Sequence, residues 1–432
     1  MTELQGFIAS RTPPGWETRP LWSLFRRRKL TGHADEELLS VYRDYGVIPK
    51  SSRDDNHNKE SDDLSGYQLV TEGSLVTNKM KAWQGSIAIS RYRGIVSPAY
   101  YVYEPLSDEW DQFLHYLLRS EPYIALYGRI SKGVRVNQWD LEHEALRNVP
   151  VMLPDLDTQK AIAEFLDHET ARIDQLIEKK QRLVGLLRER SLSAIEKAVT
   201  ADASLSKLGH HVKILPGYAF ASTSFSTDEV DIRLLRGANV SPGRIRWDDV
   251  VYWPQEDTDG LDRFQLEVGD IVMGMDRPWI SGGIRVAEIT ERDVPALLLQ
   301  RVCKIIPLKT LSKEFLKLLL SSKKFLGYFE PELTGVSVPH ISGDQIAGFR
   351  FTYVPVSQQD ERARACQKVL KSNDAITERA RKSMSRLQEF RSALITAAVT
   401  GQIDVATWGK QGQTDRRLDQ IEEDMALREA RA

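Results

Sequence analysis

The stretch EFRSALITAAVTG, residues 389–401, closely resembles an earlier stretch of the same chain, ERSLSAIEKAVTA at residues 189–201. The two align without a gap at an offset of 389 − 189 = 200 residues, with Ile195 on Ile395 and 198–200 on 398–400. Self-similarity at one fixed offset is typical of a duplicated structural unit. The chain of 432 residues is therefore predicted to contain the same architecture twice.

Each copy of this stretch closes a long helical pattern. Residues 158–200 contain no proline and place apolar side chains three and four positions apart, which is the spacing of one helical stripe. At 1.5 Å per residue such a helix would be roughly 65 Å long. Residues 357–401 follow Pro355, end at Gly401 and show a similar stripe. We expect two long helices that pair antiparallel as a coiled coil. The positions predicted for helix–helix or partner docking are Ile162, Phe165, Leu166, Ile173, Leu176, Leu183, Leu187, Ile195, Leu370, Ile376, Leu387, Leu394 and Ile395.

The stretches before the two helices also resemble each other. Residues 72–90 resemble 267–287, and FLHYLLRS at 113–120 resembles FLKLLLSS at 315–322. Both regions read as short strands separated by Gly, Pro and Asn, followed by one helix. The predicted fold class is α+β, with two similar α+β domains separated by two long antiparallel coiled-coil helices in a pseudo-two-fold internal repeat. The expected boundaries are 1–154 and 202–355 for the domains, 155–201 and 356–401 for the helices, and 402–432 for a charged tail with a short helix.

Composition limits the class of protein. No apolar run is long enough for a transmembrane helix, and the first residues lack the basic start and apolar core of a signal peptide. The two cysteines, Cys303 and Cys366, lie far apart without a CxxC pattern, so neither a disulfide framework nor a zinc site is expected. These features predict a cytoplasmic protein. The formal net charge of −2 leaves nucleic-acid binding open, because phosphate contacts depend on local patches.

Several windows in both halves combine basic and amide side chains with few acids. Arg and Lys neutralise phosphates, Arg can bond guanine, and Asn or Gln can bond adenine. The predicted DNA contacts are Arg26, Arg27, Arg28, Lys29, Lys79, Lys81, Trp83, Arg91, Tyr92, Arg93, Arg129, Lys132, Arg135, Asn137 and Gln138 in the first half, and Arg233, Arg236, Asn239, Arg244, Arg246, Arg277, Trp279 and Arg285 in the second.

The chain has neither a GxxxxGK[ST] phosphate loop nor a GxGxxG dinucleotide motif, and no nucleophilic or paired-carboxylate pattern stands out. We therefore expect a binding protein without catalytic or metal-ligating residues of its own.

The segments PDLDTQKAIAEFLD (154–167) and RSALITAAVTGQID (391–404), in this order of domains and helices, resemble the specificity subunits of type I restriction–modification systems over nearly the whole chain. The resemblance implies two target recognition domains that read the halves of a bipartite, asymmetric double-stranded DNA site. It also implies helices that set the spacer between the half-sites and recruit two modification subunits, which methylate adenine.

Under this resemblance the chain itself binds no cofactor. S-adenosylmethionine, ATP and Mg would belong to the modification subunits and to ATP-dependent restriction subunits. Two other hypotheses stay open from the sequence: a stand-alone DNA-modifying or DNA-cleaving enzyme with an unrecognised site, and a coiled-coil scaffold that binds only protein.

Overall fold

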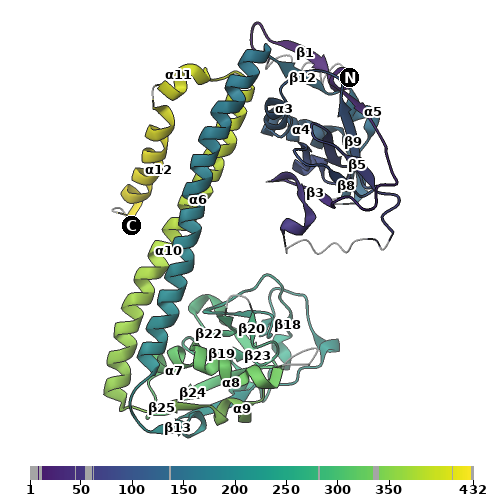
Figure 1. Ribbon diagram of the computed structural model, residues 1–432. Coiled ribbons are helices and arrows are strands. Elements are labelled where there is room, and N and C mark those ends of the chain that lie inside the picture. The colour runs from purple at the N-terminus through teal and green to yellow at the C-terminus, as the bar shows by residue number, and fades with distance from the viewer. Residues whose placement is uncertain are drawn as a thin grey trace. The chain divides into compact units, whose positions relative to one another are not determined.

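The computed structural model describes residues 8, 12–43, 45–53, 61, 63–135, 138–280, 283–333, 340–410 and 412–429. The chain divides into two compact units (Figure 1). Unit 1 comprises residues 1–181 and 379–432, and unit 2 comprises residues 182–378. The expected division into consecutive domains and helices therefore differs from the compact units, because each long helix contributes one part to each unit.

Unit 1 contains a four-stranded antiparallel sheet in the order β2-β9-β6-β7, formed by Phe25–Arg27, Tyr100–Pro105, Leu75–Asn78 and Ile87–Ile89. Four strand pairs accompany it: β1 with β12 (Glu17–Pro20, Pro150–Leu153), β3 with β4 (Leu39–Tyr42, Gly46–Pro49), β5 with β8 (Gln68–Val70, Gly94–Val96) and β10 with β11 (Ser131–Arg135, Gln138–Leu141). The short helices are α2 (Leu21–Leu24), α3 (Asp111–Leu118), α4 (Glu121–Ile130) and α5 (His143–Arg147).

Unit 2 repeats this plan with a four-stranded antiparallel sheet in the order β14-β24-β19-β22, formed by Val212–Pro216, Val302–Pro307, Ile271–Gly274 and Val286–Glu288. Three further strands form the sheet β18-β15-β23, at Tyr252–Trp253, Ile232–Leu235 and Ala296–Leu298. The pairs are β13 with β25 (Leu205–Lys207, Arg350–Thr352), β16 with β17 (Val240–Ser241, Arg244–Ile245) and β20 with β21 (Trp279–Ile280, Gly283–Ile284). Helices α7 (Lys313–Leu320), α8 (Lys323–Leu333) and α9 (Gly343–Gly348) complete the unit.

The duplication read from the sequence is present in the topology. Strands β6 and β19 occupy the same place in the two sheets, and so do their neighbours β9 and β24. Along the chain, helix α3 follows β9 and helix α7 follows β24. The fold class is thus α+β with an internal repeat. What distinguishes unit 2 is the additional sheet β18-β15-β23. Its Leu234 and Leu297 belong to a separate core cluster that also includes Val272 of β19.

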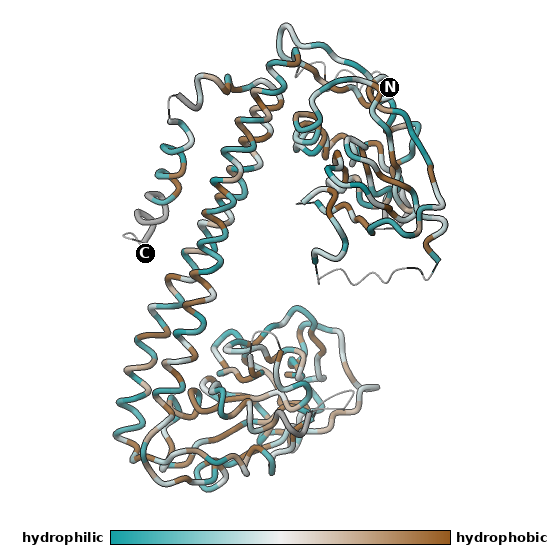
Figure 2. The backbone as a smooth tube through the Cα atoms, in the orientation of Figure 1, coloured by the Kyte–Doolittle hydropathy of each residue, from teal (hydrophilic) through white to brown (hydrophobic). Residues whose placement is uncertain are grey.

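The long helices are α6 (Leu156–Val199) and α10 (Val356–Val399), each of 44 residues. Apolar and polar residues alternate along both (Figure 2), as the stripe of an amphipathic helix requires. In unit 2 the Asn373 amide nitrogen bonds Ser191 Oγ at 2.8 Å and Arg362 bonds the Thr200 carbonyl at 2.8 Å. Since the residue number falls on α10 as it rises on α6, the two helices run antiparallel.

Most of the predicted docking positions on the long helices are covered by their own unit. Ile162, Leu166, Ile173, Leu187, Ile195, Leu387 and Leu394 are buried, and Phe165, Leu176, Leu370, Ile376 and Ile395 are partly buried. Leu183 differs, because 40% of its surface is exposed. Leu183 is thus the predicted docking position that the protein buries least.

One glutamine near the start of each long helix joins that helix to the neighbouring globular part, and the two glutamines make matching hydrogen bonds. In unit 1 the buried Gln159 accepts a bond from the Trp110 backbone N–H at 2.9 Å and donates to the Pro154 carbonyl at 2.9 Å. In unit 2 the buried Gln359 accepts from the Ser312 N–H at 2.8 Å and donates to the Val354 carbonyl at 2.7 Å. Trp110 and Ser312 are the N-cap residues of α3 and α7. The same side chain therefore satisfies the same orphan helix donor in both copies.

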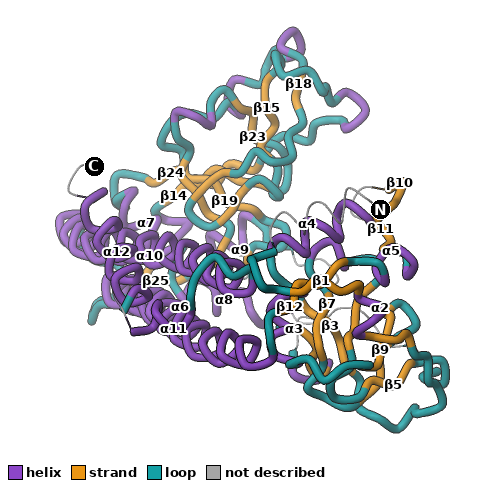
Figure 3. The backbone as a smooth tube through the Cα atoms, turned by 90° about the horizontal axis from the view of Figure 1, so that it is seen from above, coloured by secondary structure: helices purple, strands orange, loops and turns teal. Residues whose placement is uncertain are grey.

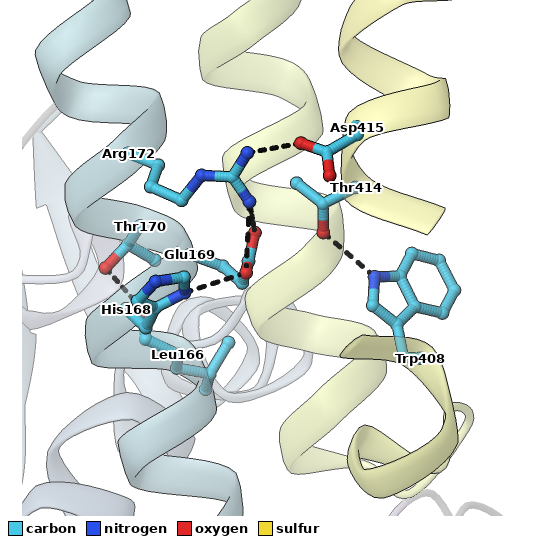
Figure 4. A network of polar contacts seen from close by, with 8 residues as sticks. All are labelled: Leu166, His168, Glu169, Thr170, Arg172, Trp408, Thr414 and Asp415. Carbon is cyan, nitrogen blue, oxygen red and sulfur yellow. Dashed lines mark hydrogen bonds and ion pairs between the residues drawn. The ribbon is translucent and has the colours of Figure 1, made fainter. Parts of the chain in front are cut away.

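The tail forms two helices, α11 (Val405–Lys410) and α12 (Gln413–Glu429), where one short helix was expected. Both lie beside the long helices in Figures 1 and 3. Figure 4 shows Arg172 of α6 between Glu169 and Asp415, with Trp408 Nε1 bonded to Thr414 Oγ1 at 3.0 Å. Further along, Glu422 pairs with Lys180 of α6 at 2.8 Å and accepts a bond from Ser383 of α10 at 2.9 Å. Helix α12 thus contacts both long helices within unit 1.

Candidate nucleic-acid interface

Two of the predicted DNA contacts in unit 1 share a single acid from a neighbouring strand. The β2–β9 register places Arg26 opposite Glu104, and Glu104 also pairs with Arg28 at 2.6 Å. The hydrogen bond from Arg26 is the main reason why the pKa of Glu104 is lowered. The windows around 26–29 and 77–95 contain no acid in their sequence, but acids from other segments reach them in the folded chain. Arg93, for example, pairs with Glu36 at 2.8 Å. Arg26, Arg28 and Arg93 are therefore weaker candidates than the sequence suggested.

Arg27 lies on the other face of the same strand. Successive side chains of a strand point to opposite faces, and Arg27 Cζ lies 4.6 Å from the centroid of the Tyr101 ring. Lys79 Nζ approaches the same ring to 4.7 Å and donates to the Pro98 carbonyl at 2.8 Å. Behind them, the Tyr103 hydroxyl and His143 Nδ1 are 3.0 Å apart. We refer to Arg27, Lys79 and Tyr101 as the Tyr101 cluster.

The surroundings of the cluster disfavour the protonated forms of Lys79 and of the neighbouring His143. Burial lowers the pKa of Lys79, and the positive charges of Arg27 and Lys29 lower it further, while Asp140 acts in the opposite direction. Burial and then Arg27 likewise lower the pKa of His143. Among the described residues, Arg27, Lys29 and Lys79 form no ion pair with a carboxylate. The cluster therefore carries an excess of positive charge.

The remaining unit 1 candidates lie at several places. Trp83 is half-buried against Trp139, with ring centroids 4.7 Å apart, and its indole N–H bonds the Met80 carbonyl. Lys81, Arg91, Tyr92, Arg129 and Lys132 are exposed, and Arg91 bonds Gln112. The side chains of Arg135, Asn137 and Gln138 lie outside the described residues.

In unit 2, the predicted adenine contact Asn239 is buried. Its side-chain oxygen accepts the Arg236 backbone N–H at 3.0 Å, and its nitrogen donates to the carbonyls of Arg246 and Asp249 at 3.0 and 2.9 Å. All of its hydrogen-bonding atoms therefore hold the loop between β15 and β18 together. This geometry is at odds with a base contact by Asn239. The sequence signal for this structural role of Asn239 is the preference of Asn for turns in which its side chain bonds the backbone.

The cations around this loop are divided between paired and unpaired states. Arg236 pairs with Asp249 at 2.8 Å and Arg246 pairs with Asp248. Arg233 lies over the Trp247 ring at 4.6 Å and donates to the Arg292 carbonyl. Arg244 is exposed, and no carboxylate pairs with it among the described residues.

A second group of arginines gathers at one end of β19. Arg285 donates to the Gly237 carbonyl at 2.5 Å, and its pKa is lowered by burial and by the neighbouring Arg277. Arg277 is exposed and has a backbone φ of 43°, and Arg301 has a φ of 72° and pairs with Asp276 at 3.0 Å. Positive φ in a non-glycine residue is costly and is often found at functional sites. Trp279 is half-buried beside them. Sequence reasoning did not find Arg301, because its partner Asp276 lies 25 residues away in the sequence.

The possible metal ligands and the thiols among the described residues are scattered or buried. No set of three or more His, Cys, Asp or Glu side chains there could hold a metal ion. Cys303 and Cys366 are buried free thiols, and burial raises the pKa of Cys303 to about 12. None of the described helices combines the length and apolar character needed to cross a membrane.

Comparison with known proteins agrees with this architecture. Residues 13–184 match the family model of the type I restriction modification DNA specificity domain. The type I restriction enzyme EcoAI specificity subunit of Escherichia coli is 39% identical over 155 residues, which are 36% of this chain and 26% of that protein. The MjaVIII specificity subunit of Methanocaldococcus jannaschii is 27% identical over 363 residues, which are 79% of this chain and 83% of that protein.

A solved structure concerned with complex assembly and conformational transition of the type I R-M system contains a chain with the same fold. It matches with a TM-score of 0.67 at 13% sequence identity, over 91% of this chain and 99% of that chain. The match to the family model covers residues 13–184 alone. Over most of its length the chain is similar to specificity subunits of type I restriction–modification systems.

Proposed function

We propose that this chain is a specificity subunit that reads a bipartite, asymmetric sequence in double-stranded DNA, with one half-site contacted by each of its two α+β parts. The internal repeat supports this reading, because the two sheets share one order and the two long helices carry equivalent glutamines. The globular parts differ in their additional strands and in their arginine clusters. Similar frameworks with different polar surfaces are suited to recognising two different half-sites.

In this proposal the chain is not an enzyme. Two modification subunits would dock on α6 and α10 and methylate adenine, and restriction subunits would join the same complex. S-adenosylmethionine, ATP and Mg would be bound by those partners, whereas this chain would supply sequence specificity and the spacing between half-sites. Such a complex acts where the chromosome lies, so we infer that it works in the cytoplasm.

The observation that carries the proposal is the duplicated framework of sheet, short helix and glutamine-anchored long helix in a chain similar to specificity subunits. It is tested by incubating DNA and labelled S-adenosylmethionine with the full chain alone, with a modification subunit alone, and with both. We expect methyl transfer to a defined sequence only from the mixture. Methyl transfer by this chain alone would support the stand-alone enzyme instead.

A second measurement separates the proposal from a protein-binding scaffold. Methylome sequencing is compared between the natural chain and a chimaera in which residues 1–154 come from another specificity subunit. The chimaera should change one half-site and leave the other and the spacer as they were. A change in both half-sites, or no change in either, would contradict independent reading by the two parts.

A further inference from the structure

The Tyr101 cluster brings two cations of unit 1 to one aromatic ring, and neither of them has a carboxylate partner among the described residues. Both Arg27 Cζ and Lys79 Nζ lie within 5 Å of one aromatic ring, at 4.6 and 4.7 Å from its centroid. Each contact alone is a weak cation–π interaction. The ring stabilises each cation but does not neutralise it, so the two positive charges still repel each other.

Neighbouring residues do not remove this repulsion. Among the described residues no carboxylate forms an ion pair with Arg27, Lys29 or Lys79, and Asp140 acts on Lys79 only from a greater distance. The direction of the Lys79 pKa shift has the same cause, because burial and like charges both disfavour the protonated amine. A site of this kind gains most from an added anion.

The backbone holds the two cations in place before any ligand arrives. Arg27 ends β2 opposite Tyr103 of β9, and Lys79 directly follows β6. The Lys79 N–H donates to the Ala99 carbonyl at 3.1 Å, and the Lys79 carbonyl accepts the Leu141 N–H at 3.0 Å. These bonds attach the strand end to both neighbouring segments. Arg27 and Tyr101 therefore lie in strands, and Lys79 lies in a turn that backbone bonds hold on both sides, which favours binding with little reordering cost.

Hydrogen-bonding capacity also remains for a ligand. The Lys79 ammonium has three donors, of which one is directed to the Pro98 carbonyl. The Arg27 guanidinium has five donors, and none has a partner among the described residues. A phosphate offers charged oxygens that accept such bonds at short distance and can be held by Arg and Lys together.

We propose that Arg27, Lys79 and Tyr101 form a phosphate-binding site for the backbone of duplex DNA, which anchors unit 1 without reading sequence. The inference rests on the proposed function and adds to it a division of labour within β2. Arg27 contacts DNA on one face, whereas Arg26 and Arg28 hold Glu104 on the other. Base readout then belongs to other residues of the unit.

Arg26 in β2 and Arg28 just after it provide a matched control, because both pair with Glu104. The full chain, assembled with its modification subunit, is titrated with a duplex that carries its methylation site and with an unrelated duplex, over a series of NaCl concentrations. Losing one phosphate contact should reduce the slope of log affinity against log salt by about 1. We expect this reduction, equal on both duplexes, for Arg27→Gln and for Lys79→Gln. Arg26→Gln and Arg28→Gln should keep the natural slope.

Tyr101 is tested separately, because the ring positions charges and adds none. Tyr101→Leu should weaken binding severalfold at every salt concentration with the slope unchanged, whereas Tyr101→Phe keeps the ring and should bind as the natural chain does. A second readout does not depend on variants: DNA should protect Lys79 from acetylation, measured by mass spectrometry, with exposed Lys371 of α10 as the reference.

The outcomes separate the site from the proposed function. If the natural chain binds DNA but the Arg27 and Lys79 variants, folded by circular dichroism, keep its slope, the phosphate site is wrong. If their loss is confined to the specific duplex, the cluster reads bases, and the inference is again overturned. Failure of the natural assembly to bind either duplex or to methylate DNA would instead refute the proposed function.

Discussion

Replacing Ile421 by Ala should loosen helix α12 from the long helices much more than removing the ion pair between Asp415 of α12 and Arg172 of α6. Ile421 is only 6% exposed and belongs to the core cluster of unit 1, together with Leu387 and Leu394 of α10. The substitution removes three carbon atoms, which corresponds to about 2 kcal/mol of transfer free energy. A hollow of about 370 Å³ already lies between Ile421 and Phe390 of α10, so we expect no large further cavity penalty.

The ion pair is expected to contribute less because it is exposed to solvent. The side chains of Arg172 and Asp415 retain 36% and 61% of their accessible surface, and such pairs are typically worth about 0–1 kcal/mol. Arg172 also keeps Glu169 as a second partner at 3.1 Å when Asp415 is replaced. Asp415→Asn should therefore have the smaller effect, and Asp419→Asn, on an exposed position of the same helix, serves as the matched control.

The assay is amide hydrogen exchange of peptides within α12, under conditions where exchange reports the free energy of local opening. A loss of about 2 kcal/mol corresponds to a roughly 30-fold lower protection factor, and 1 kcal/mol to about fivefold. Ile421→Ala should show the larger loss, Asp415→Asn at most the smaller one, and Asp419→Asn none. Equal losses for the first two, or release of α12 by about 0.5 M NaCl alone, would refute the argument that apolar burial holds this helix.

Three further predictions concern other parts of the chain. Gln159→Leu and Gln359→Leu should each lower the free energy of unfolding by about 1–3 kcal/mol, because each leaves a buried backbone N–H and carbonyl without a partner. Thermal melting measures this loss, and an equal loss from Gln358→Leu, at an exposed position, would contradict the prediction. Arg277→Gly should relieve a left-handed backbone at φ 43°, so the melting temperature should stay the same or rise by a few degrees. The same variant should bind DNA more weakly in a mobility-shift assay. A lower melting temperature would speak against stored strain at this position. Burial, with Arg119 beside it, lowers the pKa of His115 from 6.5 to about 3. Because the folded state binds fewer protons than the unfolded state, the contribution of His115 is complete above about pH 6.5 and decreases below it, by at most about 2 kcal/mol at pH 5. Denaturant titrations at both pH values should show a smaller pH dependence for His115→Gln, and an unchanged dependence would exclude this residue as the cause.

The sequence anticipated the repeat because side-chain periodicity is a local property. The stripes at 158–200 and 357–401 predicted α6 and α10 to within a few residues. The match between FLHYLLRS and FLKLLLSS likewise identified α3 and α7 as equivalent helices. In contrast, the tail was expected to form one helix, and it forms α11 and α12 with a turn between them.

Individual site residues were harder to anticipate because their surroundings come from distant segments. Arg26 and Arg28 stand in an acid-free window, yet Glu104 reaches both through the pairing of β2 with β9. Asn239 has the side chain of an adenine reader, but its amide is used within its own loop. Residue type shows what a side chain can bond, whereas burial and register show which bonds are already made.

By itself, the amino-acid sequence determined that this protein has two like halves, two long amphipathic helices and segments that resemble those of specificity subunits. These properties follow from residue spacing, which is preserved along a chain whatever its tertiary contacts. Only the tertiary structure decided which cations keep their charge uncompensated, that Gln159 and Gln359 play matching roles, and that α12 packs against α6 and α10. The physical reason is that a charge is neutralised, and an apolar face covered, by whatever lies within a few ångströms in space, and strand register brings together residues that the sequence keeps more than 70 positions apart.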